Sequence, residues 1–559
     1  MYRPLPAFVA LAVLSAFSFA QTPQPAKPEP AKAEAPKAQA PKPEPPPEQK
    51  AFSAAMAVKE PDKKAEALEK FIADFPDKPM TQFARQEWVN SLVKAYPKDR
   101  TKTIDKILPE IEKQKPVDKP SAYLTLAGAL MREDTFLKEA DKFAAKAIKL
   151  FKMEDLAASM KESAEKAKRP VPTADYIKKV YNSRKAGYQE QHAQIAEKAK
   201  DEDKARRLYA SALKKDPTRG AAAAALAKYA EKEGKNREAM EYAAIARLSR
   251  PSAENNKRFA DLYAKVKNGN GGNIEEYLDA KYDKLYPLPI HPVRYERTAK
   301  TTDRVVLAQV HTGSGCPPCV AADLAFDAAM ERYSRRELAV VMFHQHIPRP
   351  DPMTNTDSLD RWKYAQGRGV PTFVIDGKTD GGGGARIDTA ATEERIRKLI
   401  DAALEVAPKA KLAVETALDG SNVRVNARAE GVDSDSQSLK LNIALAEKMV
   451  TYSGENGVRH HPMVVRSFTG YALEGAKSKA VEHTFSLPEV VAKLKKHLDD
   501  FEVKDERHNK DGKFRFLAKP YEMNPSNLAV VAWVEDEKTK DILNSIYVEV
   551  PSTKLVTSR

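Results

Sequence analysis

Cys316 and Cys319 are the only cysteines in this chain of 559 residues. They form the segment Cys-Pro-Pro-Cys, shortly after the apolar run Val305–Val310 and directly before a helical pattern. Two thiols three residues apart at a helix start lie close enough to form a disulfide. A chain that uses no other cysteine but keeps two at this spacing indicates redox or metal chemistry, and a structural pair is the plainer alternative.

The predicted helix start gives the two thiols different roles. At a helix N-terminus, free N–H groups and the macrodipole favour the thiolate form of a cysteine. We therefore expect Cys316 to be accessible, with a lowered pKa, and Cys319 to be shielded. Pro317 and Pro318 have no N–H group to donate, so we do not expect the lowest thiol pKa values known in proteins.

The N-terminus has the pattern of an export signal. Arg3 supplies a positive charge, residues 7–17 are apolar, and Ser18-Phe19-Ala20 has the small residues of a cleavage site. We expect a signal peptide over 1–20, with an uncleaved anchor as the alternative, and an exported protein, periplasmic or secreted, in a compartment where disulfides persist. Residues 21–50 are almost only Pro, Ala, Lys, Glu and Gln, which predicts a disordered linker.

The charge of the chain argues against a nucleic-acid partner. The formal net charge is +14, but the lysines are spread along the chain and do not form a basic cluster with aromatic residues between them. No later segment is apolar and long enough to span a bilayer. We therefore expect neither nucleic-acid binding nor a transmembrane segment in the mature protein.

Residues 51–283 have the apolar spacing of helices throughout. Asp216-Pro217 and Arg250-Pro251 stand 34 residues apart. Small or apolar residues recur between them at Leu226, Ala230, Ala239, Ala243 and Ala246. This pattern resembles the tetratricopeptide repeat, with Ala239, Ala246 and Pro251 on three of its signature positions. It favours either a concave surface for a protein partner or a helical spacer.

Residues 296–405 resemble the thioredoxin family. The strand over Val305–Val310 is followed by Cys-Pro-Pro-Cys and a helix expected to run to Tyr333. A second strand is expected over Leu338–Phe343, and Gly369-Val370-Pro371-Thr372-Phe373 is similar to the family's cis-proline turn and following strand. A hairpin at Asp376-Gly377 and a closing helix over 392–404 complete the expected α/β domain.

The resemblance implies roles for six residues. Cys316 would be the nucleophile and Cys319 the resolving thiol, joined as a disulfide in the oxidised state. Pro371 would be cis and pack against the pair. Val370, Thr372 and Gly315 would contact an extended protein substrate. No cofactor is implied beyond the redox-active disulfide.

Two residues depart from the family pattern. Gly315 stands where the family usually has Trp, which we expect to open the site. Val310 stands where thioredoxin itself has a buried Asp that assists proton transfer to the second cysteine. We therefore do not expect a fast general reductase, and the chain is compatible with an oxidant, a reductant or an isomerase.

The segment from His344 to Gly369 is unusual for the family. His344 and His346 follow a strand whose end lies beside the cysteines in a thioredoxin sheet, and we expect one of them to reach the site. Such a histidine would serve as a proton shuttle or, with Cys316 and Cys319, as a metal ligand; satisfied or surface histidines are the alternative. A helix over 358–366, capped by Thr356, is expected within the segment.

From about Lys411 the apolar residues alternate with period two. About eight strands are expected over 410–559, including one over Phe514–Ala518, with a helix over Leu487–Leu498. This pattern resembles an immunoglobulin-like sandwich. His460 and His461 have no third ligand in the sequence nearby, so we expect them to be structural.

The sequence thus predicts a multidomain α + α/β + β protein with a helical-repeat domain (51–283), a thioredoxin-like domain (296–405) and a β-sandwich (410–559). The favoured function is an extracytoplasmic thiol-disulfide oxidoreductase that acts on protein disulfides. Copper or zinc handling by the Cys pair and a histidine is one alternative. A non-enzymatic adaptor that binds partners through its helices is the other.

Overall fold

Apolar helical faces dominate the first part of the chain, and the computed structural model describes residues 45–551 apart from 169, 268–271 and 433–436. The chain divides into two compact units, 1–109 and 110–559. The described part of the first unit is helical, with a short π-helical turn (Thr101–Asp105) leading into α4. Its helices are α1 (Pro47–Ala57), α2 (Pro61–Asp74), α3 (Thr81–Ala95) and the first residues of α4 (Lys106–Glu112).

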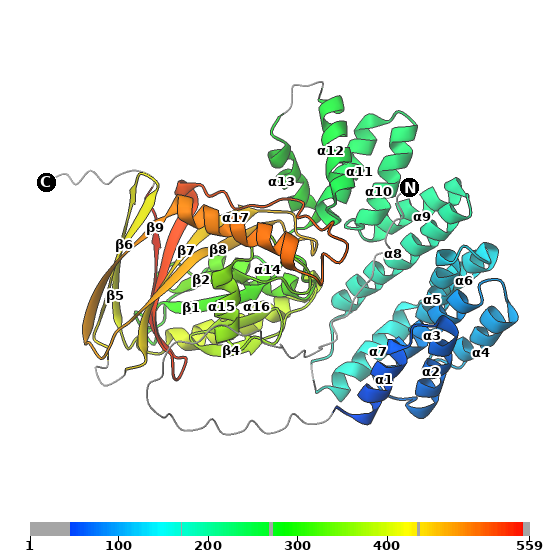
Figure 1. Ribbon diagram of the computed structural model, residues 1–559, viewed down its shortest axis with the longest axis horizontal. Coiled ribbons are helices and arrows are strands. Elements are labelled where there is room, and N and C mark those ends of the chain that lie inside the picture. The colour runs from blue at the N-terminus through cyan, green and yellow to red at the C-terminus, as the bar shows by residue number, and fades with distance from the viewer. Residues whose placement is uncertain (1–44, 169, 268–271, 433–436, 552–559) are drawn as a thin grey trace, which may run out of the picture. The chain divides into compact units, whose positions relative to one another are not determined.

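The second unit begins with helices that pack against helices next or next but one in sequence (Figure 1). They are α5 (Lys119–Arg132), α6 (Leu137–Leu150), α7 (Met153–Lys166), α8 (Ala174–Lys198), α9 (Glu202–Lys215), α10 (Gly220–Lys232), α11 (Asn236–Ser249), α12 (Ala253–Val266) and α13 (Ile274–Leu285). The small residues Ala230 of α10 and Ala239 and Ala243 of α11 are buried in one apolar cluster, as the sequence predicts, and Ala246 is buried as well. This part of the unit, the helical array (119–285), is helical-repeat-like.

An eight-stranded mixed sheet follows in the described chain, in the order β11-β10-β7-β8-β2-β1-β3-β4. Its strands are β1 (Val306–Thr312), β2 (Leu338–His344), β3 (Thr372–Ile375), β4 (Lys378–Gly381), β7 (Leu439–Thr451), β8 (His460–Ala472), β10 (Leu528–Asp536) and β11 (Ile542–Glu549). β1 and β2 are parallel, and β3 pairs antiparallel with β1. The predicted hairpin at Asp376-Gly377 connects β3 to β4, and both of its residues have positive φ.

Strands from two predicted domains share this sheet. The sequence predicts a separate sandwich from residue 410 on, yet β8 pairs with β2 through Met342 and Val464. The core is continuous across this join, because Phe343 from β2 and Val531 and Trp533 from β10 belong to one buried cluster. The four strands β7, β8, β10 and β11 therefore extend the sheet that carries β1 and β2.

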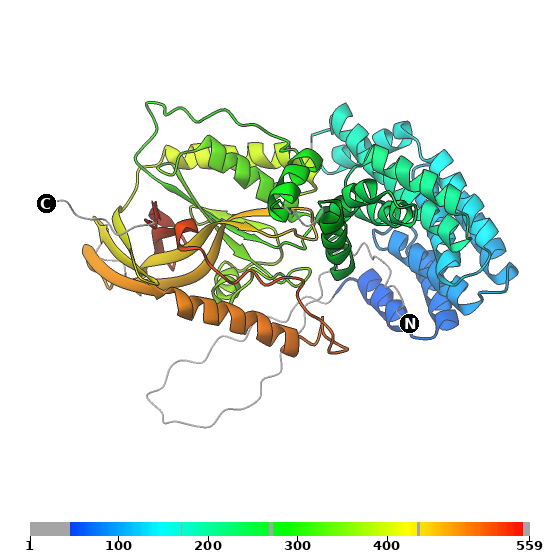
Figure 2. The ribbon, with the colours of Figure 1, turned by 90° about the horizontal axis from the view of Figure 1, so that it is seen from above.

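A three-stranded antiparallel sheet packs against β7, β10 and β11 of the large sheet. It has the order β5-β6-β9, from β5 (Lys411–Asp419), β6 (Asn422–Glu430) and β9 (Ser478–Ser486). Val423 and Val425 on β6 pack with Ile443 on β7 and Val530 on β10 in a second apolar core. Helix α17 (Leu487–Lys504) lies along the strands (Figure 2).

Three further helices pack on the large sheet near β1 and β2. They are α14 (Cys319–Arg332), α15 (Thr356–Tyr364) and α16 (Thr389–Leu404). Successive residues of a strand face opposite sides of a sheet. Thr312 of β1 bonds to α14 and Gln309 bonds to α15, so these two helices cover opposite faces.

Several element boundaries differ from the predictions. The described residues 514–518 form no strand, so that prediction is wrong. Helix α15 is capped by Asn355, whose side chain accepts the N–H of Ser358, rather than by Thr356. Residues 47–50, predicted to be linker, begin α1 because Pro47 suits the first turn of a helix. The predicted signal peptide and most of the linker lie outside the described residues. No helix in the described part of the chain combines the length and apolar character needed to cross a membrane.

A buried ion pair joins the strands that the two predicted domains contribute to the large sheet. Arg361 of α15 donates to Glu535 of β10 at 2.5 Å and to Gln309 of β1 at 2.7 Å. The Arg361 and Glu535 side chains are 7% and 3% exposed. Trp533 and Asn442 also donate to Glu535. The carboxylate therefore has several donors, as a buried charge requires.

We expect Arg361→Met to destabilise the 110–559 unit by about 3–5 kcal/mol, because it leaves Glu535 buried without its cation. Urea unfolding followed by tryptophan fluorescence measures the change. Lys363→Met on the same helix is the control, since the Lys363–Asp360 pair is exposed, and its effect should stay within about 0.5 kcal/mol. The double variant Arg361→Met/Glu535→Leu should recover much of the loss. Equal midpoints for Arg361→Met and the control would contradict this account.

Candidate functional site

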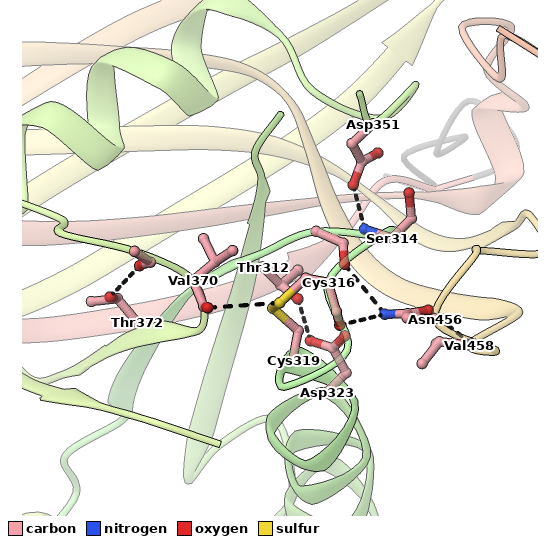
Figure 3. Close-up of a disulfide and its surroundings, with 12 residues drawn as sticks. Thr312, Ser314, Cys316, Cys319, Asp323, Asp351, Val370, Thr372, Asn456 and Val458 are labelled. Atoms are coloured by element: carbon pink, nitrogen blue, oxygen red, sulfur yellow. Dashed lines mark hydrogen bonds between the residues drawn. A yellow bond between two sulfur atoms is a disulfide. The ribbon is translucent and has the colours of Figure 1, made fainter. Parts of the chain in front are cut away.

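The two cysteines are joined as a disulfide at the end of β1 (Figure 3). Their Cα atoms are 5.3 Å apart. Helix α14 begins at Cys319, whereas the sequence predicts a start at Cys316. Pro317 and Pro318 form a turn before the helix, so Cys316 precedes it. The pairing of the cysteines is confirmed.

The first N–H groups of α14 are already bonded to carbonyl oxygens. Cys319 donates to the Cys316 carbonyl at 3.2 Å, and Val320 donates to Pro317 at 3.4 Å. The N–H of Ala321 bonds to the carbonyl of Gly384, in a loop after β4. These donors are not directed at the Cys316 sulfur. In the disulfide form these N–H groups therefore do not contact that sulfur, and a stabilised Cys316 thiolate stays a prediction.

Both sulfur-bearing residues are buried, with exposed fractions of 1% for Cys316 and 0% for Cys319. The predicted accessibility of Cys316 is therefore wrong, and the predicted shielding of Cys319 is confirmed. Gly315 does not open the site, because the side chain of Arg349 lies against it. The Gly383 backbone closely approaches the Pro318 carbonyl and the Pro371 ring. Two loops within residues 296–405, those of Arg349 and Gly383, thus cover the pair.

The expected proline turn lies beside Cys316. The Val370–Pro371 peptide bond is cis, as the sequence predicts. The Val370 carbonyl oxygen lies 3.6 Å from the Cys316 sulfur, a contact that a reduced thiol would convert into a donated hydrogen bond (Figure 3). Pro371 is buried. The Thr372 hydroxyl donates to the carbonyl of Gly369 at 2.7 Å, so its hydrogen is used within the turn.

Asp323 is a buried carboxylic acid one helical turn after Cys319. It is 6% exposed, and the Thr312 hydroxyl donates to it at 2.6 Å (Figure 3). Burial raises the pKa of Asp323 from 3.8 to about 7, although the Thr312 bond and the nearby His344 partly oppose this rise. Val310 has no ionisable group, but Asp323 supplies the site with a carboxyl group that exchanges protons near neutral pH.

His344 supports the cysteine loop through Asp351. The His344 Nδ1 atom lies 2.8 Å from an Asp351 oxygen that also accepts the N–H of Ser314, two residues before Cys316. Burial alone would raise the pKa of Asp351, but the His344 ring and the backbone N–H groups outweigh burial and lower this pKa. His461 contacts the His344 ring edge-on, and burial lowers the pKa of His461 to about 3. Of the two candidate histidines, His344 is the one that connects to the cysteine loop.

His346 is directed away from the cysteines. Its Nε2 atom lies 3.2 Å from Nε2 of His497 on α17, and its ring stacks on Phe501. The N–H of Asp351 donates to the His346 Nδ1 atom, so Nε2 carries the ring proton. The predicted set of Cys316, Cys319, His344 and His346 is therefore not brought together. Among the described residues, no group of three or more His, Cys, Asp or Glu side chains is arranged to hold a metal ion.

Asp323 and Asp351 are functional candidates that the sequence reasoning missed. Asp323 interrupts the apolar segment that follows Cys319, at the i+4 spacing that places it on the same helix face. An acidic residue at that position was a usable signal. Asp351 lies in a proline-rich loop, where nothing in the sequence distinguishes it from an exposed charge.

The chain matches no known family description and no curated protein. Two solved structures show a distant similarity. HBP35 of Porphyromonas gingivalis is 14% identical over 46% of this chain and 79% of its own, with a TM-score of 0.31. Protein AGR_C_4864 from Agrobacterium tumefaciens is 12% identical over 47% of this chain and 99% of its own, with a TM-score of 0.28. Similarities this low carry no argument about activity.

We expect Asp323→Asn to change how stability depends on pH. The folded pKa of Asp323, about 7, lies above the ordinary value of 3.8, so the folded state holds a proton that the unfolded state has lost. The wild type should therefore lose about 1.4 kcal/mol per pH unit, relative to the variant, from about pH 4 to 7. Above pH 7 the difference should be constant.

Urea unfolding of both proteins at intervals from pH 4 to 9 measures this difference. Asp360→Asn, at a largely exposed position, is the control and should follow the wild type at every pH. A difference between Asp323→Asn and wild type that does not vary with pH would show that Asp323 is ionised throughout.

Proposed function

We propose that this protein is a thiol-disulfide oxidoreductase of the thioredoxin-like type, acting outside the cytoplasm, with Cys316 and Cys319 as its redox pair. The observation that carries the proposal is the arrangement at the end of β1. The Cys-Pro-Pro-Cys disulfide precedes a helix, faces the Val370-Pro371 turn, and has Asp323 one turn further along. The order of β1, α14, β2, α15, β3, β4 and α16 also supports a thioredoxin-like domain.

In the proposed reaction, the Cys316 thiolate attacks one sulfur of a substrate disulfide and releases the other as a thiolate. Cys319 then attacks the Cys316 sulfur of the mixed disulfide, which closes the Cys316–Cys319 bond and releases the second substrate thiol. The two electrons pass from the cysteine pair to the substrate, and the reverse sequence oxidises a substrate dithiol. Asp323 accepts the proton of Cys319 as it attacks, directly or through water.

An adaptor is the second candidate, and the burial of the disulfide favours it. Both cysteines are almost completely inaccessible, as in a disulfide that only stabilises a fold. The helical array would then provide the binding function, as tetratricopeptide-like repeats do. A reduction potential below about −300 mV would be typical of such a structural disulfide. Metal handling is the weaker alternative, because His346 is bonded to His497 and not directed at the cysteines.

We expect Cys319→Ser to trap a substrate. Without the resolving thiol, Cys316 should remain in a mixed disulfide with a protein disulfide such as that of insulin, whereas Cys316→Ser should trap much less. Non-reducing electrophoresis with mass spectrometry of the adduct measures both. Each variant is fully reduced before the substrate is added. Equal trapping by the two variants, or no trapping by Cys319→Ser, would contradict the assigned roles.

We expect Asp323→Asn to slow the resolving step by roughly 10²-fold or more at pH 7, because general-base assistance is lost. Stopped-flow reduction of insulin, with the formation and decay of the mixed disulfide followed separately, measures the two steps. The first attack should keep its rate. If the variant and the wild type resolve equally fast at every pH from 5 to 9, Asp323 takes no part in the exchange.

A further inference from the structure

The loop that connects β7 to β8, residues 452–459, lies against the turn that carries Cys316. The Asn456 side-chain amide donates to the carbonyls of Cys316 at 3.2 Å and Gly313 at 3.3 Å (Figure 3). Its backbone N–H donates to the carbonyl of Ser314 at 3.0 Å. Asn456 thus holds three residues of the cysteine loop from a position 140 residues further along the chain.

The same loop is held on its other side by α13, the last helix of the helical array. The Arg459 guanidinium donates to Glu275 and to Asp279, both at 2.7 Å, and to the Ser453 hydroxyl at 3.0 Å. The Arg459 side chain is 3% exposed, whereas Glu275 and Asp279 are 52% and 40% exposed. Helix α13 and the sheet belong to one compact unit. Arg459 therefore closes the neck of the loop and ties it to the helical array.

Tyr282 of α13 and Tyr286, directly after the helix, complete the contact between α13 and the loops over the disulfide. The Tyr282 hydroxyl accepts from the Arg459 N–H at 3.4 Å and from the Arg386 guanidinium at 3.3 Å. Arg386 also donates to the Gly457 carbonyl and lies over the Tyr286 ring. Arg386 follows closely on Gly383, whose backbone abuts Pro318 and Pro371. Two segments that cover the disulfide, the β7–β8 loop and the loop around Gly383, are thus connected to α13.

We propose that α13 is a latch that keeps the β7–β8 loop over the Cys316–Cys319 disulfide, with Arg459 as the catch and Asn456 as a positioning residue for Cys316. An attacking thiolate must approach a disulfide sulfur along the S–S axis, and a pair with 1% and 0% exposure admits no such approach until a cover moves. The proposal deepens the proposed function, since it makes access to the redox pair depend on the helical array. The latch limits access to the disulfide whether or not the protein is an enzyme.

The rate at which dithiothreitol reduces the disulfide measures the latch. One dithiothreitol thiolate attacks a protein sulfur and its second thiol closes a ring, so dithiothreitol is oxidised and the protein gains two thiols. The rate is followed by alkylation with N-ethylmaleimide and mass spectrometry of the full chain. Glu275→Gln/Asp279→Asn removes the two carboxylates that hold Arg459. We expect reduction at least about tenfold faster, because two charge-assisted hydrogen bonds become weaker bonds to neutral amide oxygens.

A matched control neutralises two carboxylates around a different arginine of the array. Glu231→Gln/Glu254→Gln removes the ion partners of Arg258 on α12, away from the loop, and should be reduced at the wild-type rate. Asn456→Ala, which breaks the contact on the cysteine side, should be reduced as fast as the α13 variant or faster. Urea midpoints, measured in parallel, should match between the α13 variant and the control, which separates opening of the loop from loss of the fold.

The outcomes separate the latch from the proposed enzyme. The latch is supported if Glu275→Gln/Asp279→Asn is reduced faster than the wild type and Glu231→Gln/Glu254→Gln is not. A wild-type rate in the α13 variant, a wild-type rate in Asn456→Ala, or equal acceleration of variant and control would overturn it. If the rates differ as expected while every protein fails to reduce insulin, the latch stands and the oxidoreductase proposal fails.

Discussion

The buried pair of Arg361 and Glu535 is the interaction that joins the two sets of strands in the large sheet. It connects α15, which precedes the proline turn, to β10, a strand about 170 residues further along the chain. Through it, β10 and its neighbours are held in the same sheet as β1 and β2. The join of β8 to β2 in turn delivers the β7–β8 loop to the cysteine loop. The burial of the disulfide is therefore a consequence of how two sets of strands share one core.

Local features of this fold could be predicted from the sequence. Alanines such as Ala239 and Ala243 mark a close helix contact because small side chains allow it. The Cys316–Cys319 bond follows from spacing, and Asp376-Gly377 makes a hairpin because both residues tolerate positive φ. Alternation of apolar residues located most of the strands as well. Each of these signals is contained within a few neighbouring residues.

The pairing of distant elements could not be predicted in the same way. The apolar run in β8 predicts a buried strand, but it does not say whether the neighbour of β8 is another sandwich strand or β2. The prediction that Cys316 is accessible was wrong for the same reason. Arg349 lies against Gly315 and Asn456 donates to the Cys316 carbonyl, both from loops whose positions the sequence leaves open. The start of α14 was predicted three residues early, because two prolines suit a turn as well as a first helical turn.

The shared sheet also sets an order of events during synthesis of the chain. β2 ends at His344, but the strand that pairs with its outer edge, β8, begins only at His460. Until more than a hundred further residues have emerged, β2 has an unpaired edge, and unpaired edges invite pairing with other chains. Pairing over such a sequence separation is slow, since a long loop must close first. The nascent chain therefore passes through a stage in which its two thiols are already made and their cover is not. A disulfide formed at that stage would be buried afterwards, when the β7–β8 loop folds over it.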